Sequence, residues 1–269
     1  MKLAICNELF EDWPMEKTCD VIAELGYSGI ELAPFTLGDT PTSVGVDKRK
    51  AIVETCARFD ISIIGLHWLL AKTTGLHLTT DDSSTRKRTT QYLMDLIDLC
   101  GDLHGNIMVF GSPLQRTIGS ISRAVANQRA REVLIPLEPL LVEKGVHLAL
   151  EPLGPEETDY WNTADETMQF IDNLGMANVG LHLDVKAMST EQKPFADIIE
   201  SSRKHLIHFH LNDPNRLGPG MGDVDYCEVI PTLQKINYDG WLSVEVFDFS
   251  PGPTTIARQS AEYMARWLD

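Results

Sequence analysis

Four acidic or imidazole side chains stand in apolar stretches in the second half of the chain. They are Glu151 in "LALEPL", Asp184 in "GLHLDVK", His210 in "HFHLND" and Glu245 in "LSVEVFD". A charged side chain is costly to bury among apolar residues unless it is paired or binds a metal ion. Two glutamates, an aspartate and a neutral histidine form a mixed oxygen and nitrogen ligand set, which suits Mn²⁺, Co²⁺, Mg²⁺ or Zn²⁺. These residues predict a site for one divalent cation, with positions left open for a substrate.

Three further histidines lie close to these residues in the sequence. His182 precedes Asp184 by two residues, and His208 stands in the same relation to His210, so each pair shares one face of a strand. We expect His182 and His208 to lie one layer deeper, behind the ligands. His205 is expected to end the preceding helix and has no predicted role.

His67 and Trp68 close an earlier apolar stretch, "ISIIGLHW", and are predicted to line a substrate pocket. The glycine-rich segment "NRLGPGMGD" (215–223) lacks the Gly-Lys-Ser/Thr ending of a phosphate-binding loop. By itself this segment is weak evidence for phosphate binding.

Short apolar runs alternate with longer amphipathic patterns along the whole chain. The candidate strands span residues 2–6, 29–33, 61–67, 106–111, 146–151, 179–184, 206–211 and 242–247. Several are apolar nearly throughout, as strands buried on both faces are. Eight such alternations in 269 residues predict one (β/α)₈ barrel, a single domain over residues 1–269. Active sites of this fold lie at the carboxyl ends of the strands, where the four candidate ligands fall.

A doubly wound open sheet is the alternative architecture. That fold usually carries a glycine-rich dinucleotide loop after its first strand. Here the first strand is followed by "NELFEDWP", which has no such pattern.

The composition restricts the partners and the compartment. A net charge of -16 repels phosphates and anionic lipid, so we predict no nucleic-acid and no membrane partner. No apolar run approaches the length of a membrane span, and the acidic N-terminal stretch is unlike a signal peptide. The five scattered cysteines form no Cys-x-x-Cys pair, which is typical of reduced thiols in a cytoplasmic protein.

The segments "ALEPLGPEE", "GLHLDVKAM", "HFHLNDPNRLGPGMGD" and "SVEVFD" resemble the xylose isomerase-like TIM-barrel superfamily. They are most similar to its sugar phosphate isomerase/epimerase branch, which includes ketose 3-epimerases, hydroxypyruvate isomerase and inosose enzymes. The resemblance covers nearly the whole chain. It implies that the four candidate ligands bind one divalent metal ion, and that Glu157 and Arg216 contact the substrate.

The chain departs from the epimerase pattern at one position. The epimerases place a substrate-contacting histidine three residues after the aspartate of strand six, where this chain has Ala187. The departure implies a different substrate specificity. The neighbouring Lys186 is a candidate to replace the lost hydrogen-bond donor.

The resemblance implies a metal-dependent sugar isomerase or epimerase that acts on a ketose, keto-polyol or related compound through a metal-stabilised enediolate. Glu151 and Glu245 are the expected groups that remove and return the proton. A dehydratase or lyase would share the enolate chemistry and is the alternative. An apurinic-site endonuclease needs additional histidines that are missing here, and a non-catalytic binding protein is the remaining alternative. The sugar, the metal and the oligomeric state stay open, although relatives often form homo-oligomers.

Overall fold

Eight parallel strands close into a barrel in the computed structural model, which describes residues 1–268. Each strand pairs with the next one in the sequence, and β8 closes the ring by pairing with β1. The strands are β1 (Lys2–Cys6), β2 (Gly29–Leu32), β3 (Ser62–Leu66), β4 (Ile107–Phe110), β5 (His147–Leu150), β6 (Val179–Asp184), β7 (Leu206–Leu211) and β8 (Trp241–Val244). The predicted (β/α)₈ barrel is confirmed; its extent as one domain over residues 1–269 stays a prediction.

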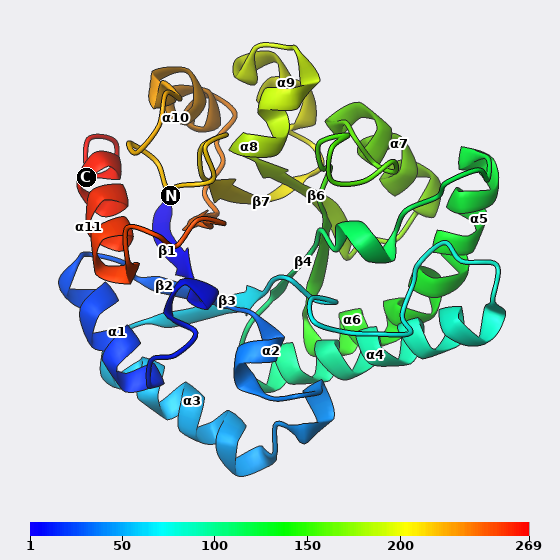
Figure 1. The fold of residues 1–269 in the computed structure, drawn as a ribbon, viewed down its shortest axis with the longest axis horizontal. Helices are drawn as coiled ribbons and strands as arrows, with labels where there is room; N and C mark the ends of the chain where they lie inside the picture. Colours follow the sequence, from blue (N-terminus) through cyan, green and yellow to red (C-terminus); the bar gives the residue numbers. More distant parts are fainter. Residues whose placement is uncertain (269) are drawn as a thin grey trace.

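Helices surround the barrel on its outer side (Figure 1). They are α1 (Met15–Glu24), α2 (Pro34–Leu37), α3 (Val46–Arg58), α4 (Ser83–Asp102), α5 (Arg123–Leu134), α6 (Glu138–Lys144), α7 (Ala164–Leu174), α8 (Val185–Met188), α9 (Phe195–Ser202), α10 (Tyr226–Lys235) and α11 (Pro253–Met264). Their boundaries follow local chemistry: Thr163 caps the first turn of α7, and Gly175 ends this helix with a φ of 73°. Within residues 1–268, no helix combines the length and apolar character needed to cross a membrane.

His205 differs from its expected place. Helix α9 ends at Ser202, so His205 lies in the turn that leads into β7 rather than at the helix end. Its Nε2 atom lies 2.8 Å from Oδ1 of Asp172, outside the barrel. His205 therefore contributes nothing to the interior of the barrel.

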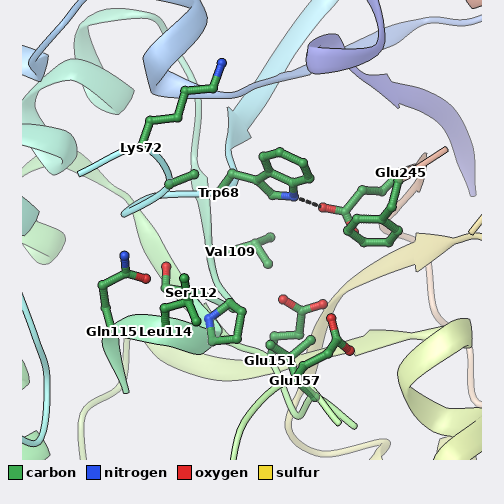
Figure 2. A pocket seen from close by; sticks show the side chains of 14 residues that line it. Trp68, Lys72, Val109, Ser112, Leu114, Gln115, Glu151, Glu157 and Glu245 are labelled. Atoms are coloured by element: carbon green, nitrogen blue, oxygen red, sulfur yellow. Dashed lines mark hydrogen bonds between the residues drawn. The ribbon is translucent and has the colours of Figure 1, made fainter. Parts of the chain in front are cut away.

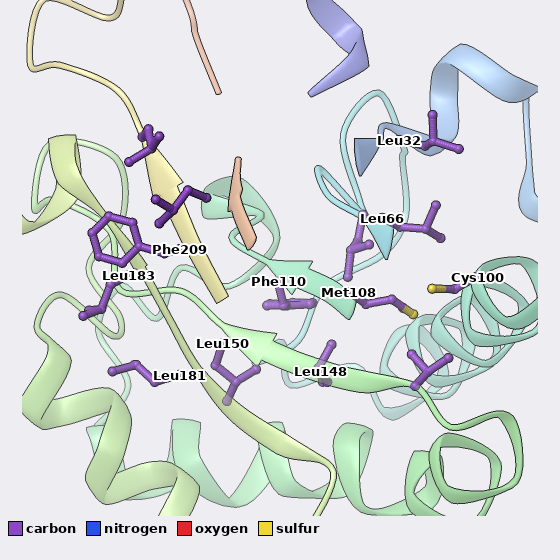
Figure 3. Packing of buried hydrophobic residues seen from close by; sticks show 14 of the residues in the cluster. Leu32, Leu66, Cys100, Met108, Phe110, Leu148, Leu150, Leu181, Leu183 and Phe209 are labelled. Atoms are coloured by element: carbon purple, nitrogen blue, oxygen red, sulfur yellow. The ribbon is translucent and has the colours of Figure 1, made fainter. Parts of the chain in front are cut away.

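Alternation along the strands separates an apolar outer face from a polar interior. Leu148 and Leu150 of β5 belong to the large cluster that packs between the strands and the helices (Figure 3). Ala149, which points the opposite way, joins a separate small cluster with Ile107 and Val109. These apolar side chains thus fill one part of the barrel interior, and the buried polar residues His182, His208 and His210 occupy another.

Strands β6 and β7 pair with a change of register. Leu181 lies opposite Leu206, whereas Asp184 lies opposite His210. Strand β7 therefore has one residue more than β6 over this stretch, which is a β-bulge. If the pairing continued from Leu181 and Leu206 without the shift in register, Asp184 would lie opposite Phe209, an outward-facing core residue. The bulge is what brings an imidazole beside the aspartate.

Candidate active site

The four predicted ligands meet at the carboxyl end of the barrel. Glu151 and Glu245 follow directly after β5 and β8, while Asp184 ends β6 and His210 lies in β7. Their exposed fractions are only 6%, 3%, 1% and 0% in that order. Ion pairing or metal binding is therefore needed to offset the burial of these charges.

The last strand is shorter than predicted. It ends at Val244 rather than at residue 247, because the N–H groups of Phe247 and Asp248 bond to the carbonyl of Arg216 instead of to a neighbouring strand. Glu245 still donates its own N–H to the carbonyl of Leu211 at 3.2 Å. The backbone of Glu245 is thus fixed against β7 although it lies outside the strand.

Backbone and amide donors hold the carboxylate of Asp184. This residue is the N-cap of α8, and its Oδ1 accepts the N–H of Ala187 at 2.7 Å. Its Oδ2 accepts a hydrogen bond from the side-chain amide of Asn212. The side-chain oxygen Oδ1 of Asn212 accepts the backbone N–H of Lys186 at 2.8 Å. Asn212 was expected to follow β7 at the rim of the barrel, but the sequence alone predicted no role for it.

The Glu245 carboxylate faces nitrogen donors on both oxygens. Its Oε1 accepts a hydrogen bond of 2.7 Å from Nε1 of Trp68, which Figure 2 shows, and lies 3.2 Å from Nδ1 of His67. Its Oε2 lies 3.0 Å from Nδ1 of His210. The other ring nitrogen of His210, Nε2, lies 3.2 Å from Oε2 of Glu31. The predicted residues His67 and Trp68 therefore lie beside Glu245.

Two buried glutamates in this network were not predicted. Glu8 follows β1 in a short 3₁₀ helix (Asn7–Phe10), and its Oε2 lies 2.9 Å from Nε2 of His67. Glu31 lies in β2, and its Oε2 lies 2.9 Å from Nε2 of His208. The signal was available in the sequence, because Glu31 is a charged residue inside the apolar run "GIELA".

His182 lies in the barrel interior below Asp184. It is fully buried, and neither ring nitrogen has a hydrogen-bond partner within residues 1–268. Its Nε2 lies 3.8 Å from Oε1 of Glu151. Glu151, His182, Asp184 and His210 each offer a ligand atom, and these atoms lie within 4.8 Å of one another. Glu245 joins this group through its contact with His210.

A cavity of about 320 Å³ opens beside these carboxylates. It is lined by Trp68, Ala71, Lys72, Val109, Gly111, Ser112, Pro113, Leu114, Gln115, Glu151, Leu153, Glu157, Glu245 and Phe247 (Figure 2). The rings of Trp68 and Phe247 stack with centroids 6.0 Å apart. Lys186 reaches the rim and donates to Oε2 of Glu157 at 2.7 Å. Arg216 is exposed and not among the lining residues; its guanidinium donates to the carbonyl of Phe247 at 3.2 Å.

The environments of the carboxyl groups push their pKa values in opposite directions. Burial raises the pKa of Glu151 well above its usual range, and repulsion from Glu245 and Asp184 adds to this. Burial likewise raises the pKa of Asp184. Burial acts in the same sense on Glu245, but His210 and His67 outweigh it and lower the pKa of Glu245. Buried carboxyl groups that repel one another form a site that a cation would stabilise.

Arg116 is a buried arginine that sequence reasoning also missed. Its side chain is fully buried and donates to the carbonyl of Glu151 at 2.6 Å. It also donates to the carbonyl of Trp161 at 3.4 Å and lies over the Trp161 ring at 5.4 Å. Arg116 thus fixes the backbone at the point where Glu151 enters the site.

Replacing Arg116 by methionine should lower the free energy of unfolding by about 2–3 kcal/mol, since two buried carbonyl groups lose a charged donor. Urea denaturation followed by circular dichroism measures this change. Arg258→Met in α11 is the control, because Arg258 is exposed. Equal midpoints for the Arg116 variant and the wild type would contradict the assignment.

Comparison with known proteins agrees with this geometry. Residues 19–267 match the family described as xylose isomerase-like TIM barrel. The chain belongs to this family. A D-psicose 3-epimerase of Enterocloster bolteae is 28% identical over 255 residues, which cover 91% of this chain and 80% of that enzyme. The predicted family is confirmed, and the prediction of an isomerase or epimerase is confirmed at the level of enzyme class.

Solved structures show the same xylose isomerase-like fold. A D-psicose 3-epimerase with D-tagatose from Clostridium cellulolyticum H10 has a TM-score of 0.86 at 21% identity, covering 100% of this chain and 99% of that one. A 3-keto-D-glucoside 4-epimerase from E. coli has a TM-score of 0.85 at 18% identity, covering 99% of each chain. At these identities the likeness concerns the fold.

Proposed function

We propose that the protein is a divalent-metal-dependent epimerase or isomerase of a ketose or a related polyhydroxy carbonyl compound. The observation that carries this proposal is the pair Glu151 and Glu245, which come from β5 and β8 and line the same cavity. Their pKa values are shifted in opposite directions. Two carboxyl groups with different proton affinities in one pocket suit the removal and return of a proton.

The residues at this site fit a divalent cation. The proposed ligands are Glu151, Asp184, His210 and Glu245, which supply three carboxylates and one imidazole. Mutual repulsion and burial of these carboxylates favour a cation among them, and the unpartnered imidazole of His182 adds a nitrogen at the same place. When bound, the ion would act as a Lewis acid that stabilises negative charge on the substrate oxygens. Mn²⁺, Co²⁺, Mg²⁺ and Zn²⁺ are the proposed candidates.

The glutamates would carry the proton. In this proposal, Glu245, whose lowered pKa keeps it ionised, takes a proton from the carbon next to the substrate carbonyl, and the electron pair of that C–H bond forms the enediolate. Glu151, whose raised pKa lets it hold a proton, gives that proton to the same carbon from the other side, which inverts the configuration. Return to the adjacent carbonyl carbon by one glutamate would instead interconvert a ketose and an aldose. The 3-epimerase names of the relatives support the first outcome.

Other residues would hold the sugar in place. Glu157 and Lys186 form an ion pair of 2.7 Å at the rim, where both can bind hydroxyl groups. Trp68 offers an apolar ring face in the same cavity. Ala187 is 4% exposed and its N–H is used by Asp184, so it offers no side-chain donor. Arg216 would have to turn from the carbonyl of Phe247 to reach a substrate.

Solvent deuterium exchange followed by NMR tests the proposed reaction. Mg²⁺-loaded protein would be incubated in D₂O with D-fructose, D-tagatose, inososes and 3-keto-glycosides. Loss of one C–H signal next to the carbonyl, with appearance of the epimer or aldose, is the expected result. Formation of a dehydrated product would favour a lyase. Absence of exchange with every compound, under conditions where bound metal is confirmed, would favour a binding protein.

Metal binding should also stabilise the fold. At a free Mn²⁺ concentration of about 100 times Kd, the free energy of unfolding should rise by about 2.7 kcal/mol. This corresponds to a rise in Tm of about 5–11 °C for a chain of this size. Differential scanning fluorimetry with chelated and Mn²⁺-loaded protein measures the difference. The variant Asp184→Asn is the control, and an equal rise in Tm for both proteins would place the ion elsewhere.

We also propose a cytoplasmic location and a possible homo-oligomer. All five cysteines are free thiols, and four of them are buried, as expected for a protein kept in a reducing compartment. Light scattering on purified protein would give the oligomeric state.

A further inference from the structure

The two ring nitrogens of His210 face different parts of the molecule. Nδ1 lies 3.0 Å from Oε2 of Glu245, which lines the cavity. Nε2 lies 3.2 Å from Oε2 of Glu31 in the barrel interior. A neutral imidazole carries its proton on only one of these nitrogens, and the other is free to bind a metal ion. The group that accepts a hydrogen bond from the protonated ring nitrogen therefore determines which nitrogen can bind the metal ion.

The carboxylate of Glu31 is placed to accept hydrogen bonds. It is fully buried in β2, and an ionised carboxylate can only accept hydrogen bonds. Its Oε2 faces Nε2 of His208 at 2.9 Å and receives the thiol of Cys6 at 3.9 Å. Cys6 is the register partner of Glu31 in β1, so the neighbouring strand fixes this contact. Two other groups, Nε2 of His208 and the thiol of Cys6, thus converge on the oxygen that faces His210.

Glu31 has no direct access to a substrate. It is not among the residues that line the cavity, and its exposed fraction is 0%. Its connection to the site runs through His210 alone among the proposed ligands. The contact route by which Glu31 can affect the reaction is therefore the orientation and the tautomer of that imidazole.

We propose that Glu31 is a positioning residue that keeps the proton of His210 on Nε2 and so presents Nδ1 to the metal ion. This inference rests on the proposed function, because it assigns His210 as a ligand. A proton on Nδ1 would instead be donated to Glu245 and would occupy the position that the ion needs. Ligating histidines commonly donate their second N–H to a carboxylate, and loss of such a partner weakens metal binding by about 10–100-fold.

NMR of the wild-type protein tests the tautomer directly. Protein labelled with ¹⁵N in histidine is compared with and without Zn²⁺, a diamagnetic probe, by long-range proton–nitrogen correlation. His210 is assigned by comparison with His210→Asn. The expected spectrum has a protonated Nε2 and a Zn²⁺-shifted Nδ1 for His210. A Zn²⁺-shifted Nε2, or a proton on Nδ1 in the loaded protein, would overturn the proposal without needing any Glu31 variant to fold.

Titration calorimetry then tests the energetic consequence. Glu31→Gln should weaken Mn²⁺ and Zn²⁺ binding by about 10–100-fold, and Glu31→Asp should restore part of the loss. Glu8→Gln is the matched control: Glu8 is equally buried and faces His67, so this change should leave the His210 tautomer unaltered. Unchanged affinity and tautomer in Glu31→Gln would overturn the positioning role while leaving the proposed function intact. A wild-type protein that binds neither ion would overturn the metal centre and this role with it.

Discussion

Glu151→Gln is expected to lower kcat by about 10²–10⁴-fold, the range that general acid–base groups contribute. Glutamine fills the same volume but cannot take up a proton. The pKa of Glu151 is raised by burial and by two neighbouring carboxylates, so this group holds a proton more firmly than an exposed glutamate does. Initial rates are measured at saturating Mn²⁺ on the substrate found by deuterium exchange.

A lower kcat of Glu151→Gln could come from a loss of bound metal or from a loss of the proton-transferring group, and the two causes must be distinguished. Metal content of the Glu151 variant is therefore determined by elemental analysis, and its Tm is compared with that of the wild type. Glu156→Gln removes an exposed carboxylate in the same loop and should retain full activity. Glu245→Gln should lose activity as Glu151→Gln does. Turnover within about tenfold of wild type in either site variant would refute the proton-transfer roles.

Gly65→Ala should have the largest effect on stability, with a loss of about 3 kcal/mol or more in the free energy of unfolding. A Cβ atom on Gly65 would lie 1.9 Å from the carbonyl oxygen of Ile107 and 2.7 Å from its carbonyl carbon. These are backbone atoms of the neighbouring strand, so no side-chain rotation relieves the overlap. Strands β3 and β4 pair through Gly65–Ile107 and Leu66–Met108, and separating them would open the barrel.

Thermal unfolding by circular dichroism measures this effect, and a Tm lower by about 6–12 °C is expected. Gly45→Ala is the matched control, because a Cβ there meets nothing within 4 Å. The φ of Gly45 is -63°, which alanine adopts without strain. A Gly65 variant that melts within about 2 °C of the wild type would show that the two strands can separate without cost.

The barrel and its four candidate ligands were predictable because they depend on local patterns. Apolar runs of strand length recur at regular intervals, and a charged residue at the end of such a run is conspicuous. Glu31 carries the same signal, but it stands in the middle of the run "GIELA" rather than at its end, so it was not predicted to belong to the site. Glu8 was read only as part of an acidic N-terminal stretch.

Other parts of the site depend on contacts between segments that are distant in the sequence. The side chain of Arg116 reaches the backbone carbonyl of Glu151 from the loop after β4. The hydrophobic periodicity of the sequence does not indicate that this loop arginine is buried. Asn212 matters because its side-chain amide, which follows β7, reaches Asp184 at the end of the neighbouring strand β6. The role of Ala187 could be stated only as a missing histidine, whereas in the structure its N–H holds the carboxylate of Asp184.

The extra residue in β7 has a consequence for how this chain can change during evolution or engineering. Below the bulge, Leu206 is matched with Leu181; above it, His210 is matched with Asp184. Deleting Ile207, the β7 residue without a partner in β6, would remove the bulge and still leave His210 opposite Asp184. Deleting a second residue, His208, would instead place Leu211 opposite Asp184 and turn the imidazole of His210 outward, toward the helices. Strand β7 can therefore lose one residue and keep the candidate reaction centre, whereas the loss of two would leave a barrel without it.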